Sequence, residues 1–195
     1  MIRRTVPQKT ISKQISLSGV GLHTGKHVNI TFKPAPADTG LVFVRDDIDG
    51  DNLINAHIKY ISNTDRGTNL DNGLFRIHTS EHVLAAITGL DIDNCFICLD
   101  GPEVPIMDGS SKFFINALEK AKIVEQNVLR EEFFPSEPIS YVCEDTGSKI
   151  SILPDDNYRV NTLVDYKTRV LGEQEASINH ISEFKKEISS ARTFS

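Results

Sequence analysis

The first third of the chain alternates apolar and polar residues with the period of two that is typical of half-buried β-strands. The expected strands cover residues 11–17, 28–32, 41–45 and 53–58. Segments rich in Gly, Pro, Asp and Asn separate these strands and predict turns. Asn72-Gly73 stands between Leu70 and Leu74 and predicts a hairpin tip, because both central positions of such a turn need a positive φ.

At Thr79 the apolar spacing changes to that of an α-helix. The apolar positions of this helix are Val83, Leu84, Ile87 and Leu90. Thr79 or Ser80 is suited to cap its first turn, and Gly89 is suited to the C′ position after its end. A buried strand is expected next, over residues 94–99.

A second helix is expected after Ser110 or Ser111, either of which could cap it. Its apolar face is made of Phe113, Phe114, Ala117, Leu118 and Ala121. A sheet with two helices on one side is a two-layer α+β domain. We place this domain at residues 1–126, because 125–133 is polar and charged and is expected to be a linker.

Residues 127–195 are expected to begin a second α+β domain of similar architecture. The strands predicted there cover residues 139–143, 150–153, 158–166 and 176–179, and a short helix is predicted over 182–188. No long helix is available to cover these strands. The second domain is therefore expected to be incomplete in this chain.

Composition excludes several functional classes. The net charge of −6 and the lack of a basic stripe argue against a nucleic-acid partner, because phosphate neutralisation supplies most of that affinity. The longest wholly apolar run, residues 83–87, is too short to span a bilayer. Pro7 and two polar residues follow Arg3 and Arg4 where a signal peptide needs an apolar run. A cytoplasmic location is expected.

Two motifs suggest chemistry but fit structural roles better. Cys95 and Cys98 have the CxxC spacing of redox and zinc sites, but they lie in an apolar β run without a second such pair, which favours buried thiols. The glycine-rich segment 18–26 matches neither the dinucleotide fingerprint nor the P-loop. It is interpreted as a connection between two strands.

The strongest chemical pattern is His78-Thr-Ser-Glu81-His82, which fits H-x-x-E-H, the inverted zinc-peptidase motif. Two histidines four residues apart bind one metal only if they share a helix face, whereas the helix is expected to start after His78. Glu81 and His82 alone would still form half of a zinc site, one ligand beside one base. The alternative is that both are ordinary polar residues at a helix N-terminus, where the dipole favours a glutamate. The pattern alone does not decide between them.

Four segments together resemble the UDP-3-O-acyl-N-acetylglucosamine deacetylases, zinc hydrolases that commit Gram-negative bacteria to lipid A synthesis. These segments are SGVGLHTGK (18–26), TSEHVLAAITGLDIDN (79–94), GPEVPIMDGS (101–110) and ARTF (191–194). The resemblance covers nearly the whole chain. It implies two domains of similar two-layer α+β fold, with the active site in the cleft between them.

The resemblance also implies roles for individual residues. His82 would be the first Zn²⁺ ligand, Glu81 the general base, and Thr193 the hydroxyl that stabilises the oxyanion. Phe194 would be a wall of the acyl-chain passage and His23 a residue lining the substrate pocket. The implied substrate is UDP-3-O-(3-hydroxyacyl)-N-acetylglucosamine, a UDP-linked acylated amino sugar whose acetamide is hydrolysed to release acetate.

One departure from the family pattern is important. The family's other two zinc ligands are a His and an Asp four residues apart on a later helix, and no H-x-x-x-D follows Thr193 here. A catalytic zinc site needs about three protein ligands. This chain alone is therefore expected to be inactive, with a missing C-terminal segment supplying the remaining ligands. An inverzincin-like peptidase and a non-catalytic binding module are the alternatives.

Overall fold

A five-stranded sheet forms the main layer of the computed structural model, which describes residues 2–64 and 66–193. Its strands, in spatial order, are β3 (Ile15–Val20), β4 (His27–Pro34), β10 (Cys95–Leu99), β5 (Leu41–Arg45) and β6 (Leu53–Asn55). The β10–β5 pair is parallel and the other pairs are antiparallel. The alternation seen in the sequence is realised in β4, where Val28, Ile30 and Phe32 are buried.

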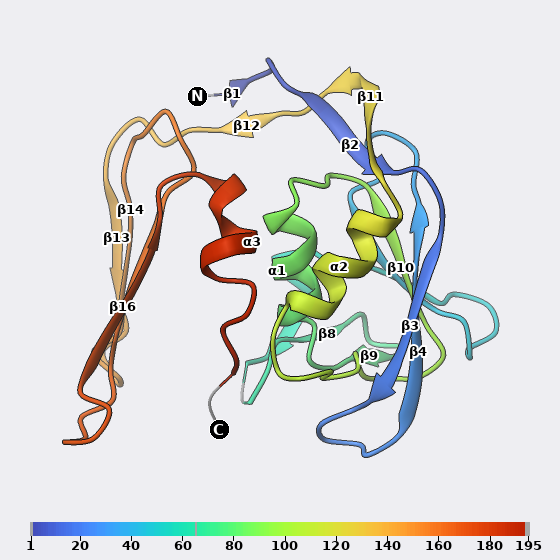
Figure 1. Cartoon of the computed structure of the whole chain (residues 1–195), viewed down its shortest axis with the longest axis horizontal. Helices are drawn as coiled ribbons and strands as arrows, with labels where there is room; N and C mark the ends of the chain where they lie inside the picture. Colours follow the sequence, from blue (N-terminus) through green and yellow to red (C-terminus); the bar gives the residue numbers. More distant parts are fainter. Residues whose placement is uncertain (1, 65, 194–195) are drawn as a thin grey trace.

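Two helices, α1 (Glu81–Gly89) and α2 (Lys112–Lys120), lie between this sheet and the C-terminal hairpins (Figure 1). Phe114 of α2 packs edge-on against Phe32 of β4, with 6.4 Å between ring centroids. Both rings are fully buried. Burial of side chains of this size contributes roughly 1.5–3 kcal/mol each, so this contact is a major part of the helix-to-sheet packing.

A three-stranded sheet leads the chain into α1. Its strands are β7 (Ile61–Asn63), β8 (Asn69–Asp71) and β9 (Arg76–Ile77), and the 3-10 helix η1 (Ile58–Tyr60) precedes β7. The hairpin predicted at Asn72-Gly73 is present between β8 and β9, and Gly73 has the expected positive φ (+87°), but Asn72 does not, because the turn spans residues 72–75.

The segment expected to be a linker forms strands instead. Residues Ile123–Leu129 (β11) pair antiparallel with Pro7–Ile11 (β2), and Glu132–Phe133 (β12) pair with Ile2–Arg3 (β1). Polar composition suggested a loop, but distant N-terminal residues supply the strand partners. The expected boundary at residue 126 falls within β11, and the division into two domains stays a prediction.

The C-terminal third consists of two hairpins and a short helix. Strands β13 (Ile139–Val142) and β14 (Lys149–Ile152) form the first hairpin, and β15 (Val160–Asp165) and β16 (Glu173–Ile178) form the second. They are followed by η2 (Ile181–Glu183) and α3 (Phe184–Glu187). Figure 1 shows α3 between the hairpins and α1. The described chain is thus mixed α/β with more strand than helix, and none of its helices is long and apolar enough to cross a membrane.

Both ends of α1 differ from the sequence-based prediction. Ser80 occupies the N-cap position, but its hydroxyl donates to Thr68 O (2.8 Å) and makes no capping bond. Gly89 lies inside the helix, and Asp91 adopts the left-handed φ of 59° expected after its end. At α2, Ser111 occupies the N-cap position but makes no side-chain capping bond, and Lys112 N donates instead to Ser110 Oγ (3.3 Å), one residue before the cap.

Candidate active site

Glu81 and His82 stand at the first two positions of α1, where a sharp turn delivers the chain into the helix. Thr79, just before them, has φ 59°. Ser80 is anchored through both its backbone N–H (3.1 Å) and its hydroxyl (2.8 Å), which donate to Thr68 O. The start of α1 is therefore held against the segment that contains Thr68.

The same segment holds the Glu81 carboxylate. Thr68 N donates to Glu81 Oε2 at 2.8 Å. Gly67 lies so close that a Cβ on it would be 3.3 Å from Glu81 Oε1. Oε2 is therefore engaged, whereas Oε1 accepts no hydrogen bond from the residues that the structure describes.

His82 has a nitrogen that lacks a partner in the part of the chain that the structure describes. Its Nε2 is buried without a hydrogen bond, and it lies 3.9 Å from Glu81 Oε1, too far for one. Leaving a buried polar atom unpaired costs about 1–3 kcal/mol, so such an atom calls for an explanation. A ring nitrogen that binds a metal ion has this arrangement, and Nε2 therefore fits one zinc ligand.

The described residues supply only this part of a metal centre. Among residues 2–64 and 66–193, no group of three or more His, Cys, Asp or Glu side chains could hold an ion. His82 is further fixed by Ser111, whose hydroxyl donates to His82 O (3.0 Å) and ties α1 to the start of α2.

His78 does not share the helix with His82. It forms a β-bridge with Glu103, and its Nδ1 lies 3.1 Å from Asn69 Oδ1. Burial lowers the pKa of this imidazole. The helix begins after the left-handed Thr79, so the helical pair that the peptidase interpretation of H-x-x-E-H requires does not form. That alternative was wrong for this physical reason.

His23 contacts the same segment that holds Glu81. Its Nε2 is 3.2 Å from Arg66 O, two residues before the Thr68 amide that binds Glu81. The glycine-rich segment 18–26 that carries His23 joins β3 to β4, as the sequence predicted. The structure thus brings His23 and Glu81 to the same short segment, residues 66–68.

Thr193 reaches the loop that precedes α2. Thr193 N donates to Gly109 O at 2.8 Å, and its Cγ2 would contact a Cβ placed on Gly109. Arg192 forms an ion pair with Asp108 in the same loop (3.7 Å). Among the described hydrogen bonds, none joins Thr193 to Glu81 or His82. Phe194 lies outside the described residues.

Sequence reasoning missed Glu103, whose carboxylate is fully buried beside this site. Its only sequence signal is an acid between Pro102 and Pro105 in a loop. The two CxxC thiols have the structural role that was expected. Both are buried, and burial raises the pKa of Cys95 to about 12, so it is not a reactive thiolate at neutral pH.

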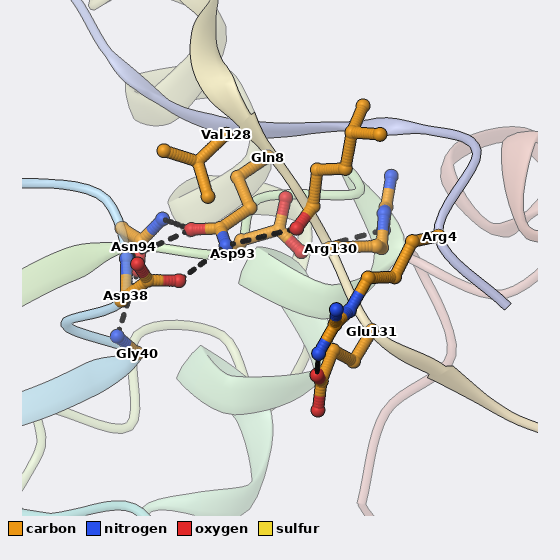
Figure 2. A pocket seen from close by; sticks show the side chains of 10 residues that line it. Arg4, Gln8, Asp38, Gly40, Asp93, Asn94, Val128, Arg130 and Glu131 are labelled. Atoms are coloured by element: carbon orange, nitrogen blue, oxygen red, sulfur yellow. Dashed lines mark hydrogen bonds and ion pairs between the residues drawn. The ribbon is translucent and has the colours of Figure 1, made fainter. Parts of the chain in front are cut away.

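A separate cavity of about 670 Å³ is lined by neither Glu81 nor His82 (Figure 2). It lies beside β2 and β11. Gln8 and Asn94 on its wall bond each other (2.8 Å), Gln8 also bonds Asp38 (2.7 Å), and Arg4 pairs with Glu131. Arg130 also lines this cavity, and its Nε is buried without a hydrogen-bond partner among the described residues, although its other two guanidinium nitrogens bond Asp91.

Comparison with known proteins identifies the family of this chain. A family model described as UDP-3-O-acyl N-acetylglycosamine deacetylase (LpxC) matches residues 8–195. A bifunctional enzyme LpxC/FabZ of Chlorobaculum tepidum is 44% identical over 97% of this chain and 41% of its own length. The UDP-3-O-acyl-N-acetylglucosamine deacetylases of Acidithiobacillus ferrooxidans and Idiomarina loihiensis are 38% and 40% identical, each over 97% of this chain and 62% of the relative. The chain spans between two fifths and two thirds of the length of these relatives.

Proposed function

Because this chain belongs to the UDP-3-O-acyl-N-acetylglucosamine deacetylase family, we propose that it is the N-terminal part of a zinc-dependent amidohydrolase. The substrate would be UDP-3-O-(3-hydroxyacyl)-N-acetylglucosamine, whose acetamide is cleaved to release acetate in lipid A biosynthesis. A UDP-linked substrate accords with the cytoplasmic location expected from the sequence. The observation that carries the proposal is the unpartnered, buried His82 Nε2 beside the fixed carboxylate of Glu81.

His82 Nε2 would be one ligand of the ion, and two further ligands would come from a segment beyond these residues. Zn²⁺ held there would lower the pKa of the attacking water toward about 7 and polarise the acetamide carbonyl. The backbone contact from Ser111 to His82 O supports the ring's placement, since it fixes the helical turn that carries the imidazole.

Glu81 would act as the general base. Its Oε2 is held by Thr68 N, so Oε1 would accept the proton of the attacking water as the water forms its bond to the acetamide carbon. The leaving amine must gain a proton when the C–N bond breaks, and a separate acid would donate it. A positioned base of this kind contributes about 10²–10⁴ in rate.

Thr193 would stabilise the carbonyl oxygen as it becomes negative, a role worth about 10²–10³ in kcat for such a donor. Its anchoring to Gly109 O, in the loop before α2, supports this placement. His23 and Phe194 would line the substrate pocket, and the Arg66 O contact of His23 supports a location close to the base.

The test uses the complete protein and measures both acetate release and bound zinc. Glu81→Ala should lower kcat by about 10²-fold or more with zinc retained, whereas His82→Ala should lose both. Glu125→Ala, a change of an exposed glutamate on β11, is the matched control and should leave both unchanged. If Glu81→Ala keeps more than about a tenth of the rate, Glu81 is not the base. A non-catalytic module would show no zinc even in the wild type.

A further inference from the structure

Glu103 is a buried carboxylate at which three separate segments meet. The residue is fully buried in the loop between β10 and α2. Its Oε1 accepts from His23 N (2.9 Å) and from Thr79 Oγ1 (3.1 Å). Its Oε2 accepts from Thr24 N (2.8 Å) and Thr24 Oγ1 (2.7 Å). All of these partners donate hydrogen bonds, and a buried carboxylate anion needs such donors in place of water.

The surrounding donors keep the carboxylate ionised. Burial by itself would raise the pKa of Glu103, but the hydrogen bonds from His23, Thr24 and Thr79 outweigh it and leave the pKa below its ordinary value. A buried charge that binds donors from distant segments restrains all of them, because any donor that moves away leaves the anion undersolvated.

The glycine-rich loop is shaped around this carboxylate. A Cβ on Gly21 would lie 2.3 Å from Glu103 Oε2 and 2.5 Å from Thr24 Oγ1, distances that real Cβ atoms do not show. Gly21 is therefore needed for close approach to Glu103. This contact is independent of the hydrogen bonds, and it indicates that loop and carboxylate fit each other closely.

The backbone at Glu103 is also fixed against the entry to α1. His78 N donates to Pro102 O (2.8 Å), and Val104 N donates to His78 O (3.0 Å). The bond from Thr79 Oγ1 to Glu103 Oε1 then acts two residues before Glu81. On the other side, Glu103 holds His23 and Thr24, and the His23 ring contacts Arg66 O near the amide that binds Glu81.

We infer that Glu103 is a positioning residue that sets the placement of Glu81 through Thr79 and the placement of His23 through the 23–24 turn. This inference rests on the proposed function, since it assigns Glu103 to the same deacetylase centre. Glu103 touches neither the reacting atoms nor the metal. The hydrogen bonds that the two threonine hydroxyls donate to Glu103 have different consequences. Loss of the Thr79 bond affects the chemical step, whereas loss of the Thr24 bond affects substrate binding.

The test compares kcat and KM of valine and serine variants at Thr79 and Thr24 in the complete protein. Thr79→Val removes one hydroxyl and should lower kcat about tenfold or more with KM nearly unchanged, because a small misplacement of a base is costly. Thr24→Val should raise KM severalfold with kcat nearly unchanged. Thr79→Ser and Thr24→Ser keep the hydroxyls and should restore both parameters. Glu103→Gln, which presents an amide N–H to these donors, should combine the two defects.

Thr10→Val is the control for loss of a buried hydroxyl far from the site. Thr10 Oγ1 donates to Asn94 O at 2.7 Å in the buried interior. This variant should lower Tm without altering kcat or KM. A second measurement, amide hydrogen exchange, should show exchange at His23 and Thr24 at least about tenfold faster in Glu103→Gln, because each amide loses a charged acceptor.

The outcomes separate the inference from the proposed function. An active wild-type enzyme in which Thr79→Val and Thr24→Val behave like Thr10→Val would overturn the inference and leave the function intact. The same conclusion follows if the serine variants fail to restore activity. A wild-type complete protein that releases no acetate would overturn the function, and the inference with it. If Glu103→Gln does not fold, the variants at Thr79 and Thr24 still decide whether Glu103 positions the site.

Discussion

At the scale of single residues, the candidate site is characterised both by the hydrogen bonds that Glu81 and His82 make and by the partners that they lack among the described residues. Glu81 has one oxygen bound by Thr68 N and one left free, and His82 has a buried nitrogen with no partner among the described residues. Two ordinary polar residues at a helix N-terminus would face water or pair with each other. The 3.9 Å gap between them leaves both available for a third group.

A substitution at Gly67 tests whether the placement of the Glu81 carboxylate matters. Its φ of +151° is rarely adopted by residues with a side chain, and a Cβ there would press on Glu81 Oε1 at 3.3 Å. Gly67→Ala should lower the free energy of unfolding by about 1–3 kcal/mol and reduce kcat, because the carboxylate must move. Gly73→Ala is the control, since Gly73 also has a positive φ (+87°) but nothing lies within 4 Å of its Cβ position. Equal loss of rate in both variants would contradict the prediction.

The sequence predicted Glu81 and His82 as candidates because an acid next to an imidazole forms a recognisable motif, and their roles stay a prediction. It could not identify Glu103, because a buried acid in a loop has no periodic pattern and its partners are about 80 residues away at His23 and Thr24. The resemblance placed Thr193 near the site, and the structure shows it anchored at Gly109. Its proposed contact with the reacting group stays a prediction.

At the scale of secondary structure, α1 is fixed at both ends by tertiary contacts. Its start depends on the Thr68 bonds of Ser80 rather than on a side-chain cap. Its last residue, Gly89, lies against α3, where a Cβ would be 2.1 Å from Phe184 Cδ1. The glycine that seemed suited to end the helix is therefore required by packing.

A double-mutant cycle at this contact has a clear expected sign. Gly89→Ala should weaken the docking of α3 and speed proteolysis near residues 181–193, because a Cβ 2.1 Å from Phe184 Cδ1 is too close for any ordinary contact and the ring must move away. In a Phe184→Ala background the same change should be neutral or stabilising by up to about 1 kcal/mol, since alanine favours a helix over glycine. Urea unfolding of the four proteins measures the coupling. Additive effects would show that the Gly89–Phe184 contact does not constrain the helix.

Asp91, just after α1, links stability to pH. Burial alone would raise its pKa, but bonds from Arg130 (2.5 and 2.9 Å) and Lys9 (2.6 Å) hold the pKa below its ordinary value. A carboxyl whose pKa is lower in the folded state stabilises the fold above the unfolded pKa, and that contribution is lost as pH falls through the folded pKa.

Asp91→Asn should therefore lower the free energy of unfolding by about 1 kcal/mol at pH 7, a modest value because the side chain is 31% exposed and its pairs are screened. Asparagine tolerates the φ of 59° at this position, so backbone strain should not contribute. The difference from wild type should shrink as pH falls through about 4 and below, as measured by urea unfolding at several pH values. A pH-independent difference would refute the linkage.

Periodicity predicted most of these elements but not the long-range pairing. Alternation and helical spacing predicted the strands near 28–32, 41–45 and 94–99 and the helices α1 and α2. The strand expected over 11–17 instead covers the end of β2, a break at 12–14 and the start of β3, and the one expected over 53–58 ends at Asn55. Strand β11 was missed because its segment is polar and its partner, β2, lies more than 100 residues earlier. Local pattern cannot show a partner at that separation, and the same limit applies to the contacts of Gly89.

At the scale of the whole molecule, the two C-terminal hairpins differ from the packed N-terminal part. Large apolar side chains on them, including Tyr141, Ile150 and Leu163, are more than half exposed. The short helix α3 contacts β16, where Ile178 is buried, but it leaves these apolar side chains exposed. An exposed apolar surface of this kind favours contact with further protein, which agrees with a chain that spans 41–62% of its relatives' length.

The proposed split of the zinc ligands between this chain and a further segment determines how residues 1–195 should bind metal. With one ligand, His82, and no described group of three metal-binding side chains, residues 1–195 alone should retain well under about 0.1 equivalent of zinc after dialysis and should not hydrolyse the substrate. The complete protein should retain about one equivalent, and His82→Ala should abolish it. Metal analysis with acetate release measures both, and His57→Ala, a change at an exposed histidine, is the control. Because a single imidazole cannot hold zinc against dialysis, stoichiometric zinc on the short chain would mean that other residues complete the centre, and the proposed division of ligands would be wrong.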